Sequence, residues 1–206
     1  KLKKFITKNS IAQILFTSGS TGNPKGVAIS HENMITNLKG LIERLEFKIK
    51  NPRFISVTPL YHNNGQFIPT LCPLYLGGQT FSIPPAQSLN NFFEIIEKNK
   101  INYTSAMATH INYFNNFKKK RKIKNLKFIC VGGAKLDEEN HKTFEKKFSV
   151  RILCNYGLTE TSSIASTEAI DKKYTKVGSV GKPLFNNRVI IKGKSPGKTI
   201  GLRADM

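Results

Sequence analysis

Short apolar runs rich in β-branched and aromatic residues alternate along this chain with longer segments of helical period, and Gly, Pro or Asn separates one from the next. The short runs predict strands at residues 11–16, 54–57, 79–83, 103–106, 128–131, 151–155 and 188–191. The longer segments predict helices at residues 32–45, 66–76, 89–98, 110–117 and 136–148, with Ser30 and Ser88 as candidate N-caps. This alternation predicts an α/β fold with a largely parallel sheet, in which ligands bind at the carboxyl ends of the strands.

The net charge of +20 raises nucleic acid or an anionic surface as a partner. However, the basic residues are mostly Lys and are scattered from Lys1 to Lys198, as a general compositional bias would scatter them. The one dense run, at residues 118–122, is interpreted as a solvated loop, with a docking patch for an acidic or phosphate-rich partner as the alternative. We therefore expect no nucleic-acid partner, and no apolar stretch is long enough to predict a transmembrane segment.

The three cysteines are Cys72, Cys130 and Cys154, an odd number with no short spacing. Neither a disulfide framework nor a zinc site is indicated. Cys130 and Cys154 lie in apolar runs and are interpreted as small core residues rather than nucleophiles. A reducing, cytoplasmic compartment is the expectation.

The strongest local pattern is the glycine-rich and hydroxyl-rich loop that follows the first predicted strand, at residues 16–26. Small residues let the backbone turn tightly and present N–H groups to an anion, hydroxyls add donors, and a lysine adds positive charge. The candidate phosphate contacts are Thr17, Ser18, Gly19, Ser20, Thr21, Gly22 and Lys25. The spacing fits neither the common P-loop nor a dinucleotide fingerprint, and a flexible Ser/Gly turn is the alternative interpretation.

Three further segments add candidate site residues in order along the chain. His62 lies in a Pro/Asn/Gly loop at residues 59–65, where a solvated side chain is the alternative. Gly132, Gly133 and Ala134 follow a predicted strand, where absent side chains allow a flat ring to approach the backbone. The last segment contains Asn155, Tyr156, Gly157, Thr159 and Glu160. A turn at residues 178–183 follows it.

Together these segments resemble the ordered motifs of the adenylate-forming superfamily, which includes acyl-CoA synthetases, peptide-synthetase adenylation domains and luciferases. The loop at 17–26 is similar to its Thr-Ser-Gly-Ser/Thr-Thr-Gly-x-Pro-Lys-Gly pattern, and residues 156–160 are similar to Tyr-Gly-x-Thr-Glu. The resemblance implies that Tyr156 packs on adenine, that Thr159 contacts the α-phosphate and that Glu160 holds Mg²⁺. It also implies that His62 lies near the acid and that the Gly132 turn borders both adenine and the acyl chain.

The resemblance implies ATP and Mg²⁺ as cofactors and a small carboxylic acid as substrate, activated to an acyl-adenylate. Coenzyme A then accepts the acyl group, as in fatty acid metabolism; a carrier protein loaded by a peptide-synthetase adenylation domain is the alternative. The fold implied is a partial layered α/β sandwich. Residues 1–206 then form part of the adenylation core, without its upstream part and without the lysine-bearing C-terminal domain. We therefore expect weak nucleotide binding without appreciable turnover, and an inactive degenerate fragment is a further alternative.

Overall fold

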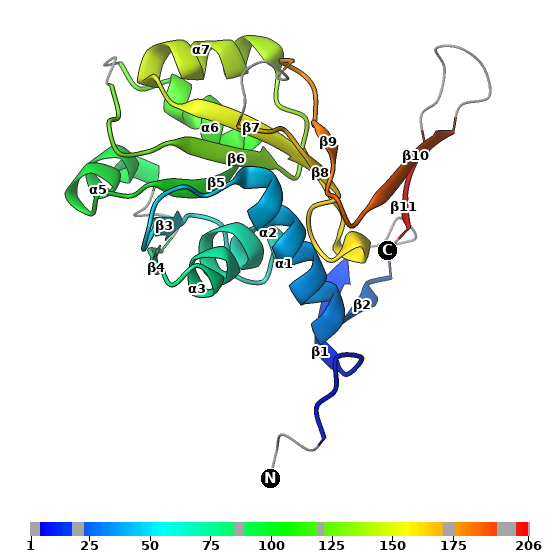
Figure 1. The fold of residues 1–206 in the computed structure, drawn as a ribbon. Helices are drawn as coiled ribbons and strands as arrows, with labels where there is room; N and C mark the ends of the chain where they lie inside the picture. The colour runs from blue at the N-terminus through cyan, green and yellow to red at the C-terminus, as the bar shows by residue number, and fades with distance from the viewer. Residues whose placement is uncertain are drawn as a thin grey trace.

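The computed structural model describes residues 5–17, 23–84, 89–118, 122–170, 176–192 and 201–205. Within this part of the chain, the central sheet has the strand order β4-β3-β5-β6-β7-β8-β9 (Figure 1). Its strands are β3 Arg53–Ser56, β4 Gln79–Ser82, β5 Tyr103–Met107, β6 Phe128–Gly132, β7 Arg151–Tyr156, β8 Ser166–Thr167 and β9 Lys182–Pro183. Strands β4, β3, β5, β6 and β7 are mutually parallel, and β8 and β9 add antiparallel strands at one edge. The predicted α/β fold with a largely parallel sheet is confirmed.

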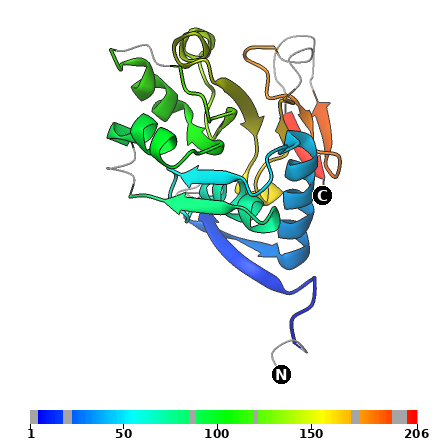
Figure 2. The same cartoon turned by 60° about the vertical axis from the view of Figure 1, so that its left-hand side comes forward.

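Helices cover both faces of this sheet (Figures 1 and 2). They are α1 His31–Leu45, α2 Asn63–Gln66, the π-helix η2 Phe67–Leu71, α3 Cys72–Tyr75, α5 Phe92–Lys98, α6 Ala108–Asn115 and α7 Glu138–Phe148, with the 3₁₀-helix η3 Thr159–Thr161 after β7. Helices α5, α6 and α7 share one hydrophobic cluster with the sheet, whereas α1, η2 and α3 share the other. Successive strand residues alternate between the two clusters, as at Phe54 and Ile55. A sheet buried on both faces explains why the strands read as continuous apolar runs.

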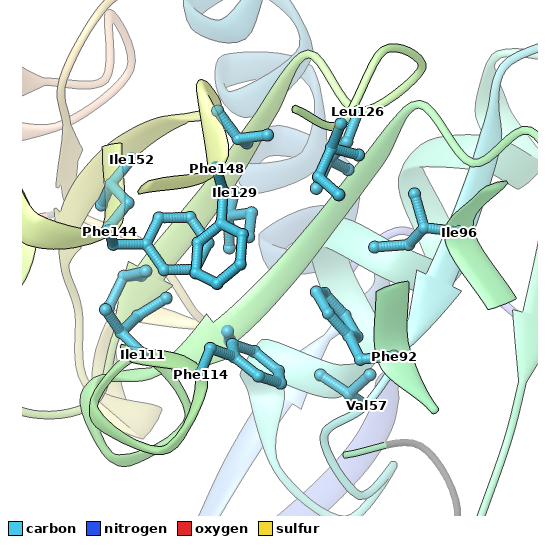
Figure 3. Packing of buried hydrophobic residues seen from close by; sticks show 14 of the residues in the cluster. Val57, Phe92, Ile96, Ile111, Phe114, Leu126, Ile129, Phe144, Phe148 and Ile152 are labelled. Carbon is cyan, nitrogen blue, oxygen red and sulfur yellow. The ribbon is translucent and has the colours of Figure 1, made fainter. Parts of the chain in front are cut away.

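The cluster under α5, α6 and α7 combines phenylalanine rings with aliphatic side chains (Figure 3). Phe92 stacks on Phe114, and Phe93 stacks on Phe148, each with ring centroids 4.4 Å apart. Offset stacking adds to the hydrophobic effect of burying these large side chains. These rings therefore join α5 to α6 and α5 to α7.

Polar side chains cap the N-termini of α1 and α7. The Ser30 hydroxyl accepts a hydrogen bond from the Asn33 backbone N–H (3.1 Å), and the Ser30 N–H donates to Asn33 Oδ1 (3.1 Å). Asp137 caps α7 by accepting from the N–H groups of Glu139 and Asn140. The second predicted cap, Ser88, lies outside the described residues.

The N-terminal part differs from the prediction in one important way. Strand β2 Lys25–Ser30 follows the glycine-rich loop and pairs antiparallel with β1 Ile11–Thr17. The prediction placed no strand between the loop and the first helix, and was wrong because Val27 and Ile29 are too few apolar residues to show alternation. Strands β1 and β2 therefore form a two-stranded sheet outside the main sheet (Figure 1).

The C-terminal part also contains a hairpin, in which β10 Arg188–Lys192 pairs antiparallel with β11 Gly201–Asp205. The strand predicted at residues 188–191 is therefore confirmed. The predicted helix at residues 66–76 begins earlier, at Asn63, and contains the π-helical segment η2.

Cys72, Cys130 and Cys154 are buried free thiols, so the interpretation of Cys130 and Cys154 as core residues is confirmed. Burial and the neighbouring carboxylates Glu168 and Glu145 raise the pKa of Cys154 to about 12, which keeps its thiol neutral. Among the described residues, no helix has the length and apolar character needed to cross a membrane. Lys118 and Lys122, at the ends of the basic run, are exposed, and residues 119–121 lie outside the described part.

Candidate nucleotide and acid site

Four neighbouring strands of the parallel sheet lead to one cavity at their carboxyl ends. The cavity has a volume of about 520 Å³ and is lined by Met107 at the end of β5 and Asn155 near the end of β7. Thr58 and Gly133 line it just beyond the ends of β3 and β6. This is the position where α/β sheets bind ligands, and the volume suits a small molecule.

The rest of the cavity wall comes from segments far apart in the sequence. Thr17 reaches it from the end of β1, and His62, Asn63 and Asn64 reach it from the start of α2. The segment after β7 contributes Gly157, Leu158, Thr159, Glu160, Ser163 and Ile164. The structure thus brings together seven of the candidate residues, namely Thr17, His62, Gly133, Asn155, Gly157, Thr159 and Glu160.

Other candidate residues lie near this wall without lining it. Lys25 begins β2 directly opposite Thr17, and its side chain is exposed. Gly132 is the last residue of β6, Ala134 is exposed two residues later, and half-buried Tyr156 ends β7. The central residues of the glycine-rich loop, Ser18, Gly19, Ser20, Thr21 and Gly22, lie outside the described residues.

A tight turn places Thr159 and Glu160 at the cavity. A Cβ atom at Gly157 would overlap the backbone carbonyl oxygen of Ser163, so the chain folds back on itself only because this residue is glycine. The Thr161 hydroxyl closes the turn, since its Oγ1 accepts from the Leu158 N–H (3.0 Å) and donates to the Leu158 carbonyl (2.9 Å). Thr159 and Glu160 therefore sit at the start of η3, beside the cavity.

Asn37 of α1 holds this turn from behind. Its side chain is 1% exposed, and its Nδ2 donates to the carbonyl oxygens of Ile164 (2.8 Å) and Thr161 (3.3 Å). The Ile164 N–H donates back to Asn37 Oδ1 at 3.5 Å. Asn37 thereby couples the first helix to the segment that presents Thr159 and Glu160.

The paired glycines after β6 differ in what surrounds them. A Cβ atom at Gly132 would overlap the amide oxygen of Asn155, whereas a Cβ atom at Gly133 would meet nothing within 4 Å. Gly133 has a positive φ of 83°, a conformation that favours glycine. Gly132 thus makes room for the Asn155 amide, and Gly133 leaves open space at the cavity wall.

Several polar atoms on the cavity wall have no hydrogen-bond partner among the described residues. They are Thr58 Oγ1, both amide atoms of Asn63, Asn64 Oδ1 and Asn155 Nδ2. Thr58 and Asn155 are 4% and 9% exposed. Because buried polar groups in proteins are normally paired, this concentration around one cavity indicates a polar ligand.

A second cavity, of about 660 Å³, lies at the amino ends of β6 and β7 and contains none of the candidate residues. Its two glutamates bond to the protein itself. Glu145 Oε1 accepts from the Ile152 N–H (2.8 Å) and lies 3.3 Å from His141 Nε2. Glu168 Oε2 accepts from the Cys154 N–H at 2.8 Å. None of the described residues that line this second cavity holds an unpartnered buried polar atom, in contrast to the cavity at the carboxyl ends of the strands.

The carboxylate of Glu160 fits the demands of Mg²⁺. The side chain is exposed on the cavity wall, and Mg²⁺ in nucleotide sites uses one or two carboxylates with the remaining oxygens from phosphate and water. Within the described part of the chain, no group of three or more His, Cys, Asp or Glu side chains forms a metal site by itself. A magnesium ion here would therefore arrive with phosphate oxygens.

Sequence reasoning assigned no role to Thr58, Asn63, Asn64, Met107 or Asn37. The two asparagines stand beside His62 in the loop that the sequence singled out, and this proximity was the available signal. Thr58 and Met107 could have been found from their positions at predicted strand ends. Asn37 gave no local signal, because its partners lie more than 120 residues away.

The comparisons with known proteins identify one family. The sequence profile of the family described as AMP-binding enzyme matches residues 2–202. Sulfoacetate–CoA ligase of Cupriavidus necator is 28% identical over 172 residues, which cover 84% of this chain and 33% of that protein. 4-Coumarate–CoA ligase-like 8 of Arabidopsis thaliana is 30% identical over 203 residues, or 96% of this chain and 36% of that protein. The chain thus spans about a third of the length of these relatives.

The fold is also found among solved structures. The O-succinylbenzoate coenzyme A synthetase of Bacillus subtilis in complex with ATP and magnesium ion superposes with a TM-score of 0.82 at 22% identity. The match covers 97% of this chain and 42% of that chain. The two proteins therefore share a fold over nearly all of the present sequence.

Proposed function

Because the chain belongs to the AMP-binding enzyme family, the adenylate-forming superfamily, we propose that its cavity binds Mg·ATP and a carboxylic acid for acyl-adenylate formation. The observation that carries this proposal is that Thr17, His62, Asn155, Thr159 and Glu160 line one cavity at the carboxyl ends of parallel strands. Its unpartnered polar atoms support the same assignment. Sulfoacetate–CoA ligase and 4-coumarate–CoA ligase-like 8 are CoA ligases by name, which supports activation of an acid for transfer to a thiol.

The residues divide the cavity into functional parts. We propose that Thr17, the hydroxyls and N–H groups of residues 18–22, and Lys25 hold the β- and γ-phosphates. Asn155, Tyr156 and the turn at Gly132, Gly133 and Ala134 border adenine, with Gly157 keeping the following turn tight. The Thr159 hydroxyl donates to the α-phosphate, and Glu160 is the ligand that would hold Mg²⁺. His62 lines the end of the cavity that receives the acid.

The chemistry is attack of the acid's carboxylate oxygen on the α-phosphorus of ATP, in line with the departing pyrophosphate. Bound Mg²⁺ would supply neutralisation of phosphate charge. The residues contribute placement and hydrogen bonds to oxygens that gain charge in the transition state. A thiol, proposed to be that of coenzyme A, then attacks the mixed anhydride and releases AMP.

We propose that residues 1–206 alone bind nucleotide weakly and turn over little. The lysine that the resemblance implies in the C-terminal domain has no counterpart in these residues. Loss of one such transition-state donor costs about 2.7–4 kcal/mol in comparable cases. Pyrophosphate release from this chain at the rate of an intact ligase would contradict the proposal. The reducing, cytoplasmic compartment stays a prediction.

The binding proposal is tested by displacement of a fluorescent ATP analogue from the 206-residue chain, with and without Mg²⁺. We expect ATP to displace the analogue at lower concentrations when Mg²⁺ is present. Glu160→Gln should abolish most of this effect of Mg²⁺. Thr159→Val should weaken ATP binding about threefold to tenfold, the effect of one lost hydrogen bond. Glu94→Gln, on α5 outside the cavity, is the matched control. Absence of ATP binding in the folded wild-type chain would overturn the proposal.

The kind of acid that binds beside the nucleotide distinguishes coenzyme A from a carrier protein as the acceptor of the acyl group. Acyl-sulfamoyladenosines are stable analogues in which a sulfamoyl group replaces the phosphate of the acyl-adenylate. Binding of analogues that carry simple acyl groups supports the ligase assignment. Binding of aminoacyl analogues alone would favour the peptide-synthetase alternative, in which a carrier protein accepts the acyl group.

A further inference from the structure

The cavity wall carries two chemically different sets of side chains. Thr17, Thr159 and Glu160 supply hydroxyls and a carboxylate, which suit phosphate and metal. The loop between β3 and α2 supplies the second set, which is Thr58, His62, Asn63 and Asn64. The chemistry of this second set determines which acid it can hold.

The loop that carries these side chains does not need their polar atoms for its own structure. Ser56 Oγ donates to the Thr58 carbonyl (3.1 Å), and Gln66 Nε2 donates to the Leu60 carbonyl (2.7 Å). The loop backbone is therefore tied by neighbouring side chains that do not line the cavity. The amide of Asn63 takes no part in these contacts.

The unpartnered atoms of this loop include both donors and acceptors. Thr58 Oγ1 is buried in a side chain that is 4% exposed, and it finds no partner among the described residues. Both the Nδ2 and the Oδ1 of Asn63 are shielded from water and unpartnered, as is Asn64 Oδ1. A purely alkyl acid would leave all of these groups unpaired, which costs binding free energy.

The charges of the cavity wall disfavour an acid that carries a second anionic group. Among the described residues that line the cavity there is no Lys or Arg, and the ionisable side chains are Glu160 and His62. A second carboxylate or a sulfonate placed here would be desolvated without a fixed cation. A neutral group that both donates and accepts hydrogen bonds satisfies the same atoms without that penalty.

We propose that the acid substrate is a short carboxylic acid that carries a neutral hydrogen-bonding group, such as a carboxamide or hydroxyl, and that Thr58, Asn63 and Asn64 select it. This inference rests on the proposed function, because it names the acid bound beside the nucleotide.

The test uses three acyl-sulfamoyladenosines of nearly equal size, with 5′-O-sulfamoyladenosine as the probe without an acyl group. The acyl groups are succinamoyl, succinyl and 4-methylpentanoyl, which end in a carboxamide, a carboxylate and two methyl groups. Dissociation constants for the 206-residue chain are measured by titration calorimetry. We expect the succinamoyl compound to bind about tenfold more tightly than either of the other two.

The variants then assign the selectivity to residues. In Asn63→Leu, the succinamoyl compound should bind no more tightly than the 4-methylpentanoyl compound. The dissociation constant of 5′-O-sulfamoyladenosine should stay the same. Thr58→Val is the second variant and should lower the ratio of succinamoyl to 4-methylpentanoyl affinity about threefold. Asn115→Leu is the matched control, since Asn115 also has an unpartnered amide oxygen but does not line the cavity. It should leave the ratio unchanged.

The outcomes separate the two proposals. Tightest binding of 4-methylpentanoyl or succinyl, or equal binding of all three, overturns the neutral polar acid and leaves the nucleotide site standing. An unchanged preference in both Asn63→Leu and Thr58→Val overturns the assignment to these residues. If neither 5′-O-sulfamoyladenosine nor any acyl compound binds the folded chain, the proposed function fails, and the inference fails with it.

Discussion

The two ends of the parallel sheet each border a cavity of similar size, but they treat polar groups in opposite ways. At the amino ends of β6 and β7, Glu145 and Glu168 accept hydrogen bonds from backbone N–H groups of β7. At the carboxyl ends, Thr58, Asn63 and Asn155 hold polar atoms without partners among the described residues. Cavity size alone does not distinguish the two ends, whereas hydrogen-bond satisfaction does.

This difference separates polar groups that serve the fold from polar groups that serve a ligand. A buried polar atom that is paired within the protein supports stability, and one left unpaired reduces it. Proteins tolerate the second kind where function requires it. The comparison therefore predicts opposite effects on stability when polar side chains are removed from the two classes.

The largest expected effect comes from Asn37, a paired group behind the carboxyl-end cavity. Asn37→Leu leaves the carbonyls of Thr161 and Ile164 without this donor in a buried setting. We expect a loss of about 3 kcal/mol in the free energy of unfolding, measured by urea denaturation. Asn116→Leu, at the exposed end of α6, is the control and should change stability little. A neutral Asn37→Leu would break the distinction between paired and unpaired groups.

Gly157→Ala should have the next largest effect. The added methyl group would overlap the Ser163 carbonyl oxygen, so the turn that presents Thr159 and Glu160 must open. We expect a cost of about 2 kcal/mol in unfolding free energy and loss of most ATP binding. Gly77→Ala is the comparison variant, since its positive φ brings strain but its Cβ would meet nothing within 4 Å. It should lower stability while ATP still binds.

Glu145→Gln tests the cavity at the amino ends of the strands through the pH dependence of stability. Burial raises the pKa of Glu145, but hydrogen bonds from His141 and the Ile152 N–H, with the charge of Arg151, outweigh it and lower the pKa overall. A lowered pKa means that ionised Glu145 stabilises the fold above about pH 5, and that this contribution is lost as the pH falls below about 4. We expect the variant to be about 1 kcal/mol less stable at pH 7 and nearly equal to wild type at pH 3.

For Glu168→Gln, we expect the stability relative to wild type to change with pH in the opposite direction. Burial, the largest influence, raises the pKa of Glu168, so its ionised form is disfavoured in the folded chain. A raised carboxyl pKa contributes stability at low pH that is lost as the pH rises. The stability of Glu168→Gln relative to wild type should therefore improve between pH 3 and pH 7. Parallel pH trends for the two variants would contradict the assigned environments.

How far the sequence predicts this molecule depends on the range over which each signal acts. The strand at residues 128–131 and the helix at 136–148 were predicted within a few residues, because their apolar periods are local. The short strand β2 was missed for lack of apolar residues. Thr17, His62 and Thr159 line one cavity, whereas the roles that the motifs imply for them stay a prediction.

What the sequence could not give is the pairing state of individual polar groups. Asn37 and Asn63 are the same residue type, yet both amide atoms of Asn37 are hydrogen-bonded, whereas neither amide atom of Asn63 has a partner among the described residues. This difference arises from contacts between segments more than 100 residues apart, which no local pattern encodes. It is also the difference from which the acid's chemistry is inferred.

The smallest effect is expected for Thr58→Val, which tests whether an unpartnered hydroxyl on the cavity wall contributes to stability. Threonine and valine have nearly the same shape, so the substitution removes an unpartnered hydroxyl without opening a cavity. We expect the free energy of unfolding to stay unchanged or to rise by up to about 1 kcal/mol, measured by urea denaturation without ligand. Thr104→Val is the matched control, because the Thr104 hydroxyl is buried and donates to the Ile55 carbonyl at 2.7 Å. It should lower stability by about 1 kcal/mol. Equal losses in the two variants would mean that the Thr58 hydroxyl is already satisfied in the free chain, and that its place on the cavity wall carries no information about the ligand.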